Sequence, residues 1–440
     1  MTPLLPGFEE HASDQITEQI SSSGIRLTVC QQKAYLALRG TENVFVTGGA
    51  GSGKSFLIRY FLCEKDLRDF PVLASTGAAA VLVGGRTFHS FFGLGIMEGG
   101  LEAAVEKACK NRQVVRRLKK ISGFIVDEVS MLSGVTLRAA EIIARRIRDN
   151  DLPWGGLRVV AVGDFAQLPP VERSAGATRG WAFLDPVWKW SNFSTCYLET
   201  QTRCQDPKYM RILAQVRQGQ VTPEVKSYLD AKMGITADDF DGTRLFPRRE
   251  ETERFNLKKL EEISQPLQVF ETIYSGDARA LETLKKYAPV PETLSLKEGA
   301  LVMLRQNDPQ NRWVNGSTGH IMKIQPGRLQ IELLNGRRID IEKASFSLLN
   351  AEGEVAAAAV NFPITLAWAS TIHKSQGATL DRMAVNLSQL WEPGQAYVAL
   401  SRLTKGDDLF VERWEARSIR VDPEVVRFYQ TLSTKIAAEV

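Results

Sequence analysis

The sequence predicts an α/β fold built on a parallel, doubly wound sheet, and three apolar segments support this prediction. Residues 43–47, 121–126 and 157–162 each have the pattern of a buried strand, and helical patterns separate them. Strands that alternate with helices are typical of parallel sheets, and such sheets bind ligands beyond the carboxyl ends of their strands. We therefore expect the functional residues to follow these three strands directly.

The first strand leads into a glycine-rich segment, residues 48–55, with the sequence GGAGSGKS. It fits the phosphate-loop pattern G-x-x-x-x-G-K-[ST], and a helical pattern follows at 56–62. Glycines let backbone N–H groups surround phosphate oxygens, and the N-terminus of a helix favours an anion. Lys54 is expected to reach the β- and γ-phosphates of ATP, and Ser55 to hold Mg²⁺. The predicted phosphate-contacting set is Gly49, Ala50, Gly51, Ser52, Gly53, Lys54 and Ser55.

The second strand ends in two acids, Asp127 and Glu128. Downstream of a phosphate loop, this pattern is typical of the metal side of an ATPase. We expect Asp127 to hold Mg²⁺, and Glu128 to orient the attacking water or accept its proton. The third strand leads to Gln167, which we expect to contact the γ-phosphate or the same water. Without the phosphate loop, the two acids would be interpreted as the solvated end of a strand.

Composition places the chain among ordinary globular proteins. It has 440 residues, 44% of them hydrophobic and 24% charged, with a net charge of +4. No apolar run is long enough to span a membrane, and the polar N-terminus does not resemble a signal peptide. Five scattered cysteines show neither metal-ligand spacing nor a disulfide framework, so we expect a reduced cytosolic setting.

Basic residues gather in two places, at 112–120 and at 244–254. Either cluster could bind nucleic-acid phosphates, and each taken alone could equally be a solvated helix face.

Taken together, these segments resemble the superfamily-one DNA helicases of the 5′-to-3′ group, most closely the petite-integration-frequency (PIF) family, with RecD and Dda helicases next. The resemblance runs from residue 27 to about 405. Two segments favour the PIF family: 152–157 followed by 162–171, and 314–319 with the sequence VNGSTG. Trp154 stands where the family more often has phenylalanine.

The resemblance assigns further roles. It implies that Gln31 reads adenine, that Arg203 and Arg402 are arginine fingers, and that Gly377 lies in a segment coupling ATP to DNA. It implies DNA contacts for Thr76, Gly77, Phe88, His89, Ser90, Thr371, His373 and Lys374. From the residues alone, Arg203 and Arg402 could instead be surface ion-pair partners.

The resemblance also implies two RecA-like motor domains, at 27–199 and 200–440. Residues 1–26 are expected to form a flexible or loosely docked N-terminal segment before them. The first domain would carry a small wedge at about 91–120. The second would carry an SH3-like β-barrel at about 291–350, where short alternating segments and the Asn335-Gly336 turn agree with strands. Phe91, Phe92 and Leu94 fit either DNA stacking or packing of the wedge. The amphipathic tail from Asp422 is expected to cap the second domain.

The expected function is therefore an ATP- and Mg²⁺-dependent helicase that moves 5′ to 3′ on single-stranded DNA and opens duplex or structured DNA. Its expected partners are single-stranded DNA and single-strand/duplex junctions. We expect no association with a membrane, and we expect the free protein to be a monomer. We expect a cytoplasmic, nucleoid-associated protein of bacterial or phage-like type, with a nuclear or mitochondrial place left open. Two rivals remain: an ATPase switch acting on a protein partner, and a DNA-binding module with a vestigial loop.

Overall fold

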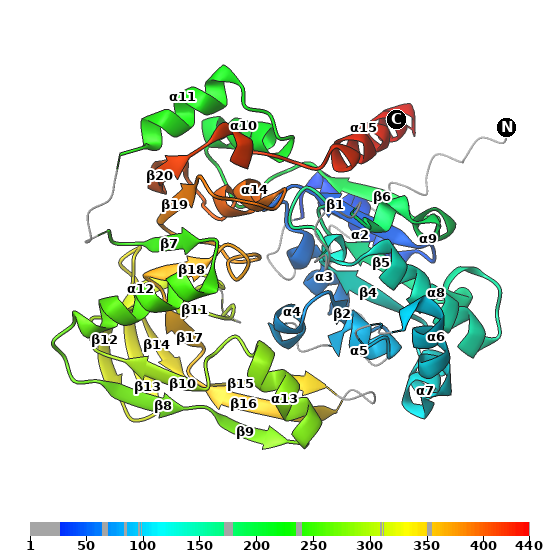
Figure 1. Cartoon of the computed structure of the whole chain (residues 1–440), viewed down its shortest axis with the longest axis horizontal. Helices are drawn as coiled ribbons and strands as arrows, with labels where there is room; N and C mark the ends of the chain where they lie inside the picture. Colours follow the sequence, from blue (N-terminus) through cyan, green and yellow to red (C-terminus); the bar gives the residue numbers. More distant parts are fainter. Residues whose placement is uncertain are drawn as a thin grey trace.

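The computed structural model describes residues 27–63, 69–82, 86–95, 97, 99–170, 179–234, 240–308, 310, 312–349 and 354–439. The predicted N-terminal segment at 1–26 lies outside these ranges. Two parallel sheets confirm the predicted α/β fold (Figure 1). No helix in the described ranges is long and apolar enough to cross a membrane.

The first sheet has six parallel strands in the order β3-β2-β4-β5-β1-β6. The strands are β1 Val44–Gly48, β2 Val72–Ala74, β3 Arg86–Thr87, β4 Gly123–Asp127, β5 Arg158–Val162 and β6 Ser194–Leu198. The accompanying helices are α2 Val29–Arg39, α3 Lys54–Leu62, α4 Gly77–Leu82, α5 Phe88–Phe92, α6 Gly100–Lys110, α7 Arg112–Lys120, α8 Gly134–Arg148 and α9 Pro186–Trp190. The three strands predicted from sequence are β1, β4 and β5, which lie side by side at the centre of the sheet. Their carboxyl ends therefore meet at one edge.

The second sheet has four parallel strands in the order β18-β7-β19-β20. They are β7 Thr243–Phe246, β18 Ala369–Thr371, β19 Met383–Leu387 and β20 Leu409–Trp414. Its helices are α10 Pro207–Arg217, α11 Pro223–Lys232, α12 Arg249–Glu261 and α14 Gln395–Leu400.

A strand-rich region interrupts the second sheet between β7 and β18. Its sheets follow the orders β14-β13-β12-β11-β17, β10-β8 and β15-β16-β9. The strands are β8 Gln268–Glu271, β9 Ile273–Gly276, β10 Thr293–Leu296, β11 Leu301–Leu304, β12 Thr318–Gln325, β13 Arg328–Leu333, β14 Arg338–Glu342, β15 Ala344–Leu349, β16 Val355–Asn361 and β17 Ile364–Leu366, with α13 Ala278–Tyr287 between β9 and β10. The strands thus extend beyond 291–350 on both sides, because β10 pairs with β8 and β11 pairs with β17.

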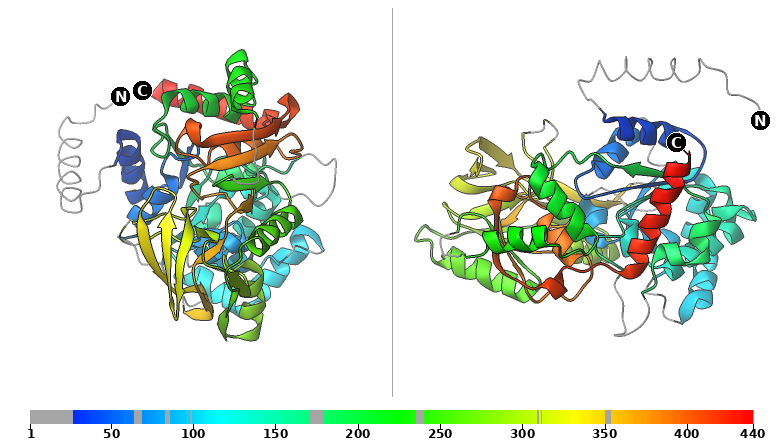
Figure 2. Two further views of the ribbon diagram at one scale, coloured as in Figure 1. Left: turned by 90° about the vertical axis from the view of Figure 1, so that its left-hand side faces the viewer. Right: turned by 90° about the horizontal axis from the view of Figure 1, so that it is seen from above.

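The C-terminal helix α15, Pro423–Glu439, corrects one prediction. Its aromatic residue Phe428 packs within the first domain, against Phe165, Phe183 and Trp188. The helix therefore covers the first domain rather than the second, beside β6 and α9 (Figure 2). The periodicity correctly predicted an apolar face, but it carried no information about which domain that face contacts.

The burial of the aromatic residues at 88–92 decides between stacking on DNA and packing inside the protein. Phe88, Phe91 and Phe92 are all buried, and Phe92 contacts Phe124 of β4. Phe88 is therefore a core residue and not the DNA contact that the resemblance implied. The packing interpretation of Phe91, Phe92 and Leu94 is the one that their burial supports.

Candidate nucleotide and nucleic-acid site

One cavity of about 1240 Å³ brings together residues from both parallel-sheet domains and the strand-rich region. The predicted site residues that line it are Ala50, Gly51, Gly53, Lys54, Ser55, Thr76, Asp127, Glu128, Gln167, Arg203, His373, Lys374, Gly377 and Arg402. Those that do not line it are Gln31, Gly49, Ser52, Gly77, Phe88, His89, Ser90 and Thr371. Lys54 and Arg402, expected on opposite sides of one nucleotide, thus face a common space.

The phosphate loop has the backbone that its glycines permit. Gly51 and Gly53 adopt φ of +81° and +86°, in the left-handed region. A Cβ on Gly53 would lie 2.4 Å from Nε2 of Gln31, and that amide donates to Ser52 O at 3.2 Å. Gln31 therefore supports the phosphate loop through this hydrogen bond to Ser52.

The Lys54 ammonium is hydrogen-bonded to the phosphate loop. Its Nζ donates to Gly48 O at 2.8 Å and to Gly49 O at 3.1 Å. Burial lowers the pKa of Lys54, while the carboxylates of Asp164 and Glu128 act in the opposite direction. A half-buried cation whose hydrogen bonds go to carbonyl oxygens is well placed to receive a phosphate.

The two acids lie directly beyond β4. Asp127 accepts the backbone N–H of Glu128 at 2.9 Å, and burial raises the pKa of Asp127. Glu128 has φ of +53°, a strained conformation for a residue with a side chain, and its buried Oε2 has no hydrogen-bond partner among the described residues. Burial, with the adjacent Asp127, raises the pKa of Glu128 to about 7. A carboxyl group with such a pKa is suited to accept a proton near neutral pH.

The pKa of Glu128 gives a first testable prediction. Below about pH 7 the group is protonated and cannot accept a proton, so kcat/KM for ATP hydrolysis should rise with pH and level off above that value. Steady-state rates at saturating oligo(dT) from pH 5.5 to 9 measure this. Nucleotide affinity of the Glu128→Gln variant over the same range controls for titration of the nucleotide itself. A flat wild-type profile would contradict the proton-accepting role.

The two candidate arginine fingers lie together. Arg203 donates to Ser401 O at 3.0 Å, which links the segment after β6 to the end of α14. Arg402 is 1% exposed and donates to Val398 O and Ser401 Oγ, both at 2.7 Å. Burial, followed by the nearby charge of Arg203, lowers the pKa of Arg402 to about 9, so the group stays charged at neutral pH.

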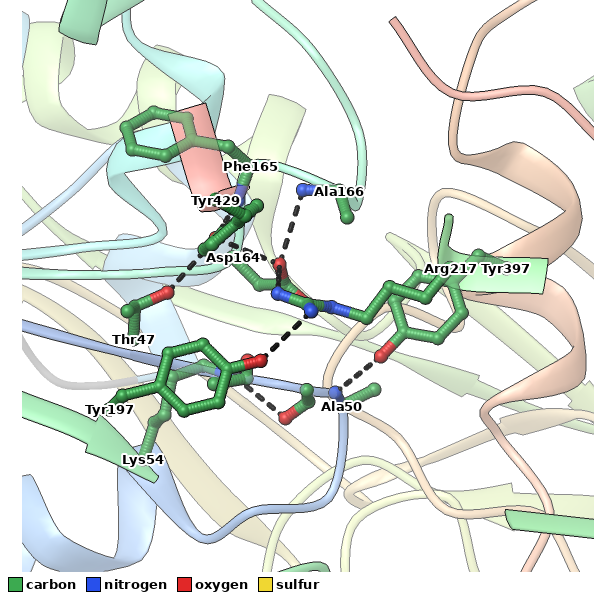
Figure 3. A network of polar contacts seen from close by, with 12 residues as sticks. Thr47, Ala50, Lys54, Asp164, Phe165, Ala166, Tyr197, Arg217, Tyr397 and Tyr429 are labelled. Atoms are coloured by element: carbon green, nitrogen blue, oxygen red, sulfur yellow. Dashed lines mark hydrogen bonds and ion pairs between the residues drawn. The ribbon is translucent and has the colours of Figure 1, made fainter. Parts of the chain in front are cut away.

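Tyr397 makes a contact that the sequence did not indicate. The backbone N–H of Ala50, inside the phosphate loop, donates to its hydroxyl at 2.7 Å. The hydroxyl comes from α14, five residues before Arg402, so the second domain directly contacts the loop of the first (Figure 3).

A buried polar network joins the same two domains to the C-terminal helix (Figure 3). Arg217 at the end of α10 binds Asp164 through two hydrogen bonds, of 2.8 and 3.1 Å. Tyr429 of α15 donates to Asp164 Oδ1 at 3.0 Å, and the Arg217 guanidinium lies 4.4 Å from the centre of its ring. Burial alone would raise the pKa of Asp164, yet Arg217 holds it below its ordinary value. The sequence indicated Tyr429 only as part of the helical periodicity of the tail, and it did not indicate Arg217, because a single polar residue on an amphipathic helix gives no sign of a buried network.

Removing Arg217 should therefore destabilise the protein. The Arg217→Met variant leaves the Asp164 carboxylate buried without its cation, which typically costs about 3–5 kcal/mol. Differential scanning calorimetry should show a melting temperature lower by on the order of 10 °C. Arg211→Met, on the same helix but 62% exposed in a surface pair with Glu224, is the control and should shift it little. Equal melting temperatures for the two variants would refute a structural role for the network.

The cavity lining also includes residues that were expected to contact DNA. Thr76, His373 and Lys374 line it, and burial lowers the pKa of His373 and of Lys374. Gly77 lies under the ring of Tyr287 from α13. Thr371 is buried and its hydroxyl accepts the N–H of Lys374 at 3.1 Å, so it shapes the turn rather than facing the cavity.

His89 and Ser90 lie outside the cavity lining on the short helix α5. Part of the first basic cluster does reach the cavity: Arg116, Arg117 and Lys120 line it. In the second cluster, Arg244 is buried in an ion pair with Glu412 at 2.6 Å, so its role is structural.

Basic residues greatly outnumber acids around this cavity. The basic lining residues are Lys54, Arg59, Arg86, Arg116, Arg117, Lys120, Arg203, Arg305, Lys374 and Arg402, and the acidic ones are Asp127 and Glu128. Such an imbalance concentrates positive potential and favours polyanions.

The loop region fits a nucleoside triphosphate with Mg²⁺. Gly51 and Gly53 take left-handed φ values that let the loop backbone curve toward a phosphate, and the hydrogen bonds of Lys54 go to carbonyl oxygens of the loop. No group of three or more acidic, histidine or cysteine side chains among the described residues forms a self-sufficient metal site. Ser55 and Asp127 match the sparse protein ligand set with which Mg²⁺ binds a nucleotide.

Comparison with known proteins agrees with this geometry. A family model described as PIF1-like helicase matches residues 27–226. The chain is 52% identical over 423 residues to the ATP-dependent DNA helicase Pif1 of Bdellovibrio bacteriovorus, and the match covers 96% of each protein. The crystal structure of Bacteroides sp Pif1 in complex with ADP-AlF4 superposes with a TM-score of 0.82 at 29% identity, covering 93% of this chain and 98% of that one. Bacteroides Pif1 bound to ssDNA gives a TM-score of 0.63 at 28% identity with the same coverage.

Proposed function

The chain belongs to the PIF1-like helicase family and is an ATP-dependent DNA helicase, and we propose that it moves 5′ to 3′ along single-stranded DNA by opening and closing the cavity between its two motor domains. The observation that carries the proposal is the shared cavity. Its lining includes the phosphate loop of one domain, the arginine of the other and the residues expected to contact DNA.

In this mechanism the residues divide the work. Lys54 and the loop amides would hold the phosphates, and Ser55 and Asp127 would hold Mg²⁺, which would supply neutralisation of the phosphate charge. Glu128 accepts the proton of the attacking water, and Gln167 positions that water or the γ-phosphate. Arg203 and Arg402 neutralise the charge that develops on the transferred phosphoryl group.

Closure around ATP would move Arg402 together with the segment that bears His373 and Lys374, because Arg402 is hydrogen-bonded to that segment. The Nη1 atom of Arg402 donates to Ser375 O at 3.4 Å and to Ala378 O at 3.5 Å. The nucleotide is thereby coupled to the DNA end of the cavity. Contacts to phosphates and stacked bases would give little sequence preference.

The rate of ATP hydrolysis with and without oligo(dT) tests the proposal against its rival. A helicase motor should hydrolyse ATP much faster once single-stranded DNA is bound. A switch acting on a protein partner should ignore the oligonucleotide, and an unchanged rate would favour that rival. The proposal also includes a monomeric free state in the cytoplasm, and light scattering coupled to gel filtration tests the monomer by its mass.

A further inference from the structure

Arg305 is a buried cation without a matching anion in the described part of the chain. It directly follows β11, it is 8% exposed, and its backbone N–H donates to Pro363 O at 2.8 Å. In the side chain, Nη1 reaches only the weak acceptor Met303 Sδ at 3.4 Å, and the buried Nε has no hydrogen-bond partner among the described residues. No salt bridge within the described ranges includes Arg305, and burial lowers its pKa to about 10, so it remains charged at neutral pH.

An uncompensated buried charge is costly, so folded proteins normally pair it. Arg305 lines the large cavity, which means that an anion entering from outside can supply the missing partner. Gln376 lines the same cavity, and its buried Nε2 is also without a partner in the described ranges. The lowered pKa of Lys374 arises from burial first and then from the charges of Arg249 and Arg305. Three donor groups on neighbouring segments can therefore turn to one incoming acceptor.

Arg305 and Lys374 lie close enough for their positive charges to interact, so an anion bound between them would relieve the repulsion. A guanidinium, an ammonium and an amide N–H₂ together match the oxygens of a phosphodiester.

We propose that Arg305, with Lys374 and the side-chain amide of Gln376, binds one backbone phosphate of single-stranded DNA. The inference rests on the proposed function, because it requires DNA to enter this cavity. The contact from Arg305 would come from the strand-rich region. The DNA strand would then be held by that region as well as by the segment that carries Lys374.

The salt dependence of oligo(dT) binding tests this contact. Fluorescence anisotropy between about 50 and 200 mM salt gives the slope of log affinity against log salt, which falls by about 0.7 for each single-strand phosphate that the protein no longer neutralises. Arg305→Met should reduce that slope by about this amount and weaken binding at least about tenfold. Arg305→Lys should keep most of the slope. Arg338→Met, 69% exposed on β14, is the matched control and should behave like wild type.

Thermal melting without DNA distinguishes binding from a structural role. Because no described anion pairs with Arg305 in the free protein, Arg305→Met should melt at the wild-type temperature or above it. A melting temperature clearly below wild type together with an unchanged salt slope would overturn the inference. So would weakened binding of an ATP analogue with unchanged DNA binding. If wild type failed to bind oligo(dT), the proposed function itself would fall, whereas normal wild-type binding with a wild-type slope in Arg305→Met would overturn only this contact.

Discussion

Replacing Lys54 with alanine should reduce kcat/KM for ATP hydrolysis by about 10²–10³-fold or more, while single-stranded DNA still binds. The ammonium is half-buried and donates to Gly48 O and Gly49 O, so it can exchange these carbonyls for phosphate oxygens. The other described lysines that line the cavity, Lys120 and Lys374, come from other segments of the chain. The loop amides remain in the variant, but the charge that stabilises the β- and γ-phosphates is lost.

Steady-state hydrolysis and oligo(dT) anisotropy, measured on the same preparation, check both parts of this expectation. Lys33→Ala, on the exposed side of α2, makes the same substitution outside the cavity and should retain wild-type rates. Hydrolysis by Lys54→Ala at a rate near wild type would disprove the phosphate-loop assignment.

Replacing Arg402 with glutamine should reduce kcat by roughly 10³–10⁵-fold, the range of arginine fingers in other nucleotide hydrolases. The charge of Arg402 reaches Glu128 across the cavity, although its hydrogen bonds to Val398 and Ser401 lie within the second domain. Those bonds fix the guanidinium, so its charge is already in place when the phosphoryl group transfers. The glutamine amide can still donate to Val398 O, which limits structural damage.

The distinguishing result is a loss of kcat with little change in ATP affinity, because the finger acts mainly in the transition state. Rapid-quench hydrolysis and equilibrium binding of a non-hydrolysable analogue measure the two quantities. Arg417→Gln, 80% exposed after β20, is the control. A defect confined to nucleotide affinity would show that Arg402 only holds the ground state.

The shared location of the phosphate loop and the two acids could be predicted, because the residues concerned directly follow strands in the sequence. Lys54 and Ser55 follow β1, and Asp127 and Glu128 follow β4, and a parallel sheet brings such strand ends to one edge. Arg203 and Arg402 required the family resemblance, since no local pattern distinguishes a finger from a surface arginine.

The rest depended on tertiary packing. The apolar face of α15 has the same periodicity whether it contacts one domain or the other, and only the fold places Phe428 against Trp188. Phe88 lies in a segment that was expected from the family resemblance to contact DNA, but its own side chain is buried in the core. Arg305 gave no sequence signal, because an arginine after a strand is usually solvated. Its missing partner is visible only once the burial of each neighbour is known.

Unwinding of two matched duplexes, one with a 5′ and one with a 3′ single-stranded overhang, distinguishes a motor that moves 5′ to 3′ from one that does not. With ATP and Mg²⁺ present, we expect strand separation on the 5′ overhang alone and none with Lys54→Ala. Separation on the 3′ overhang alone, or on neither substrate despite active hydrolysis, would contradict it.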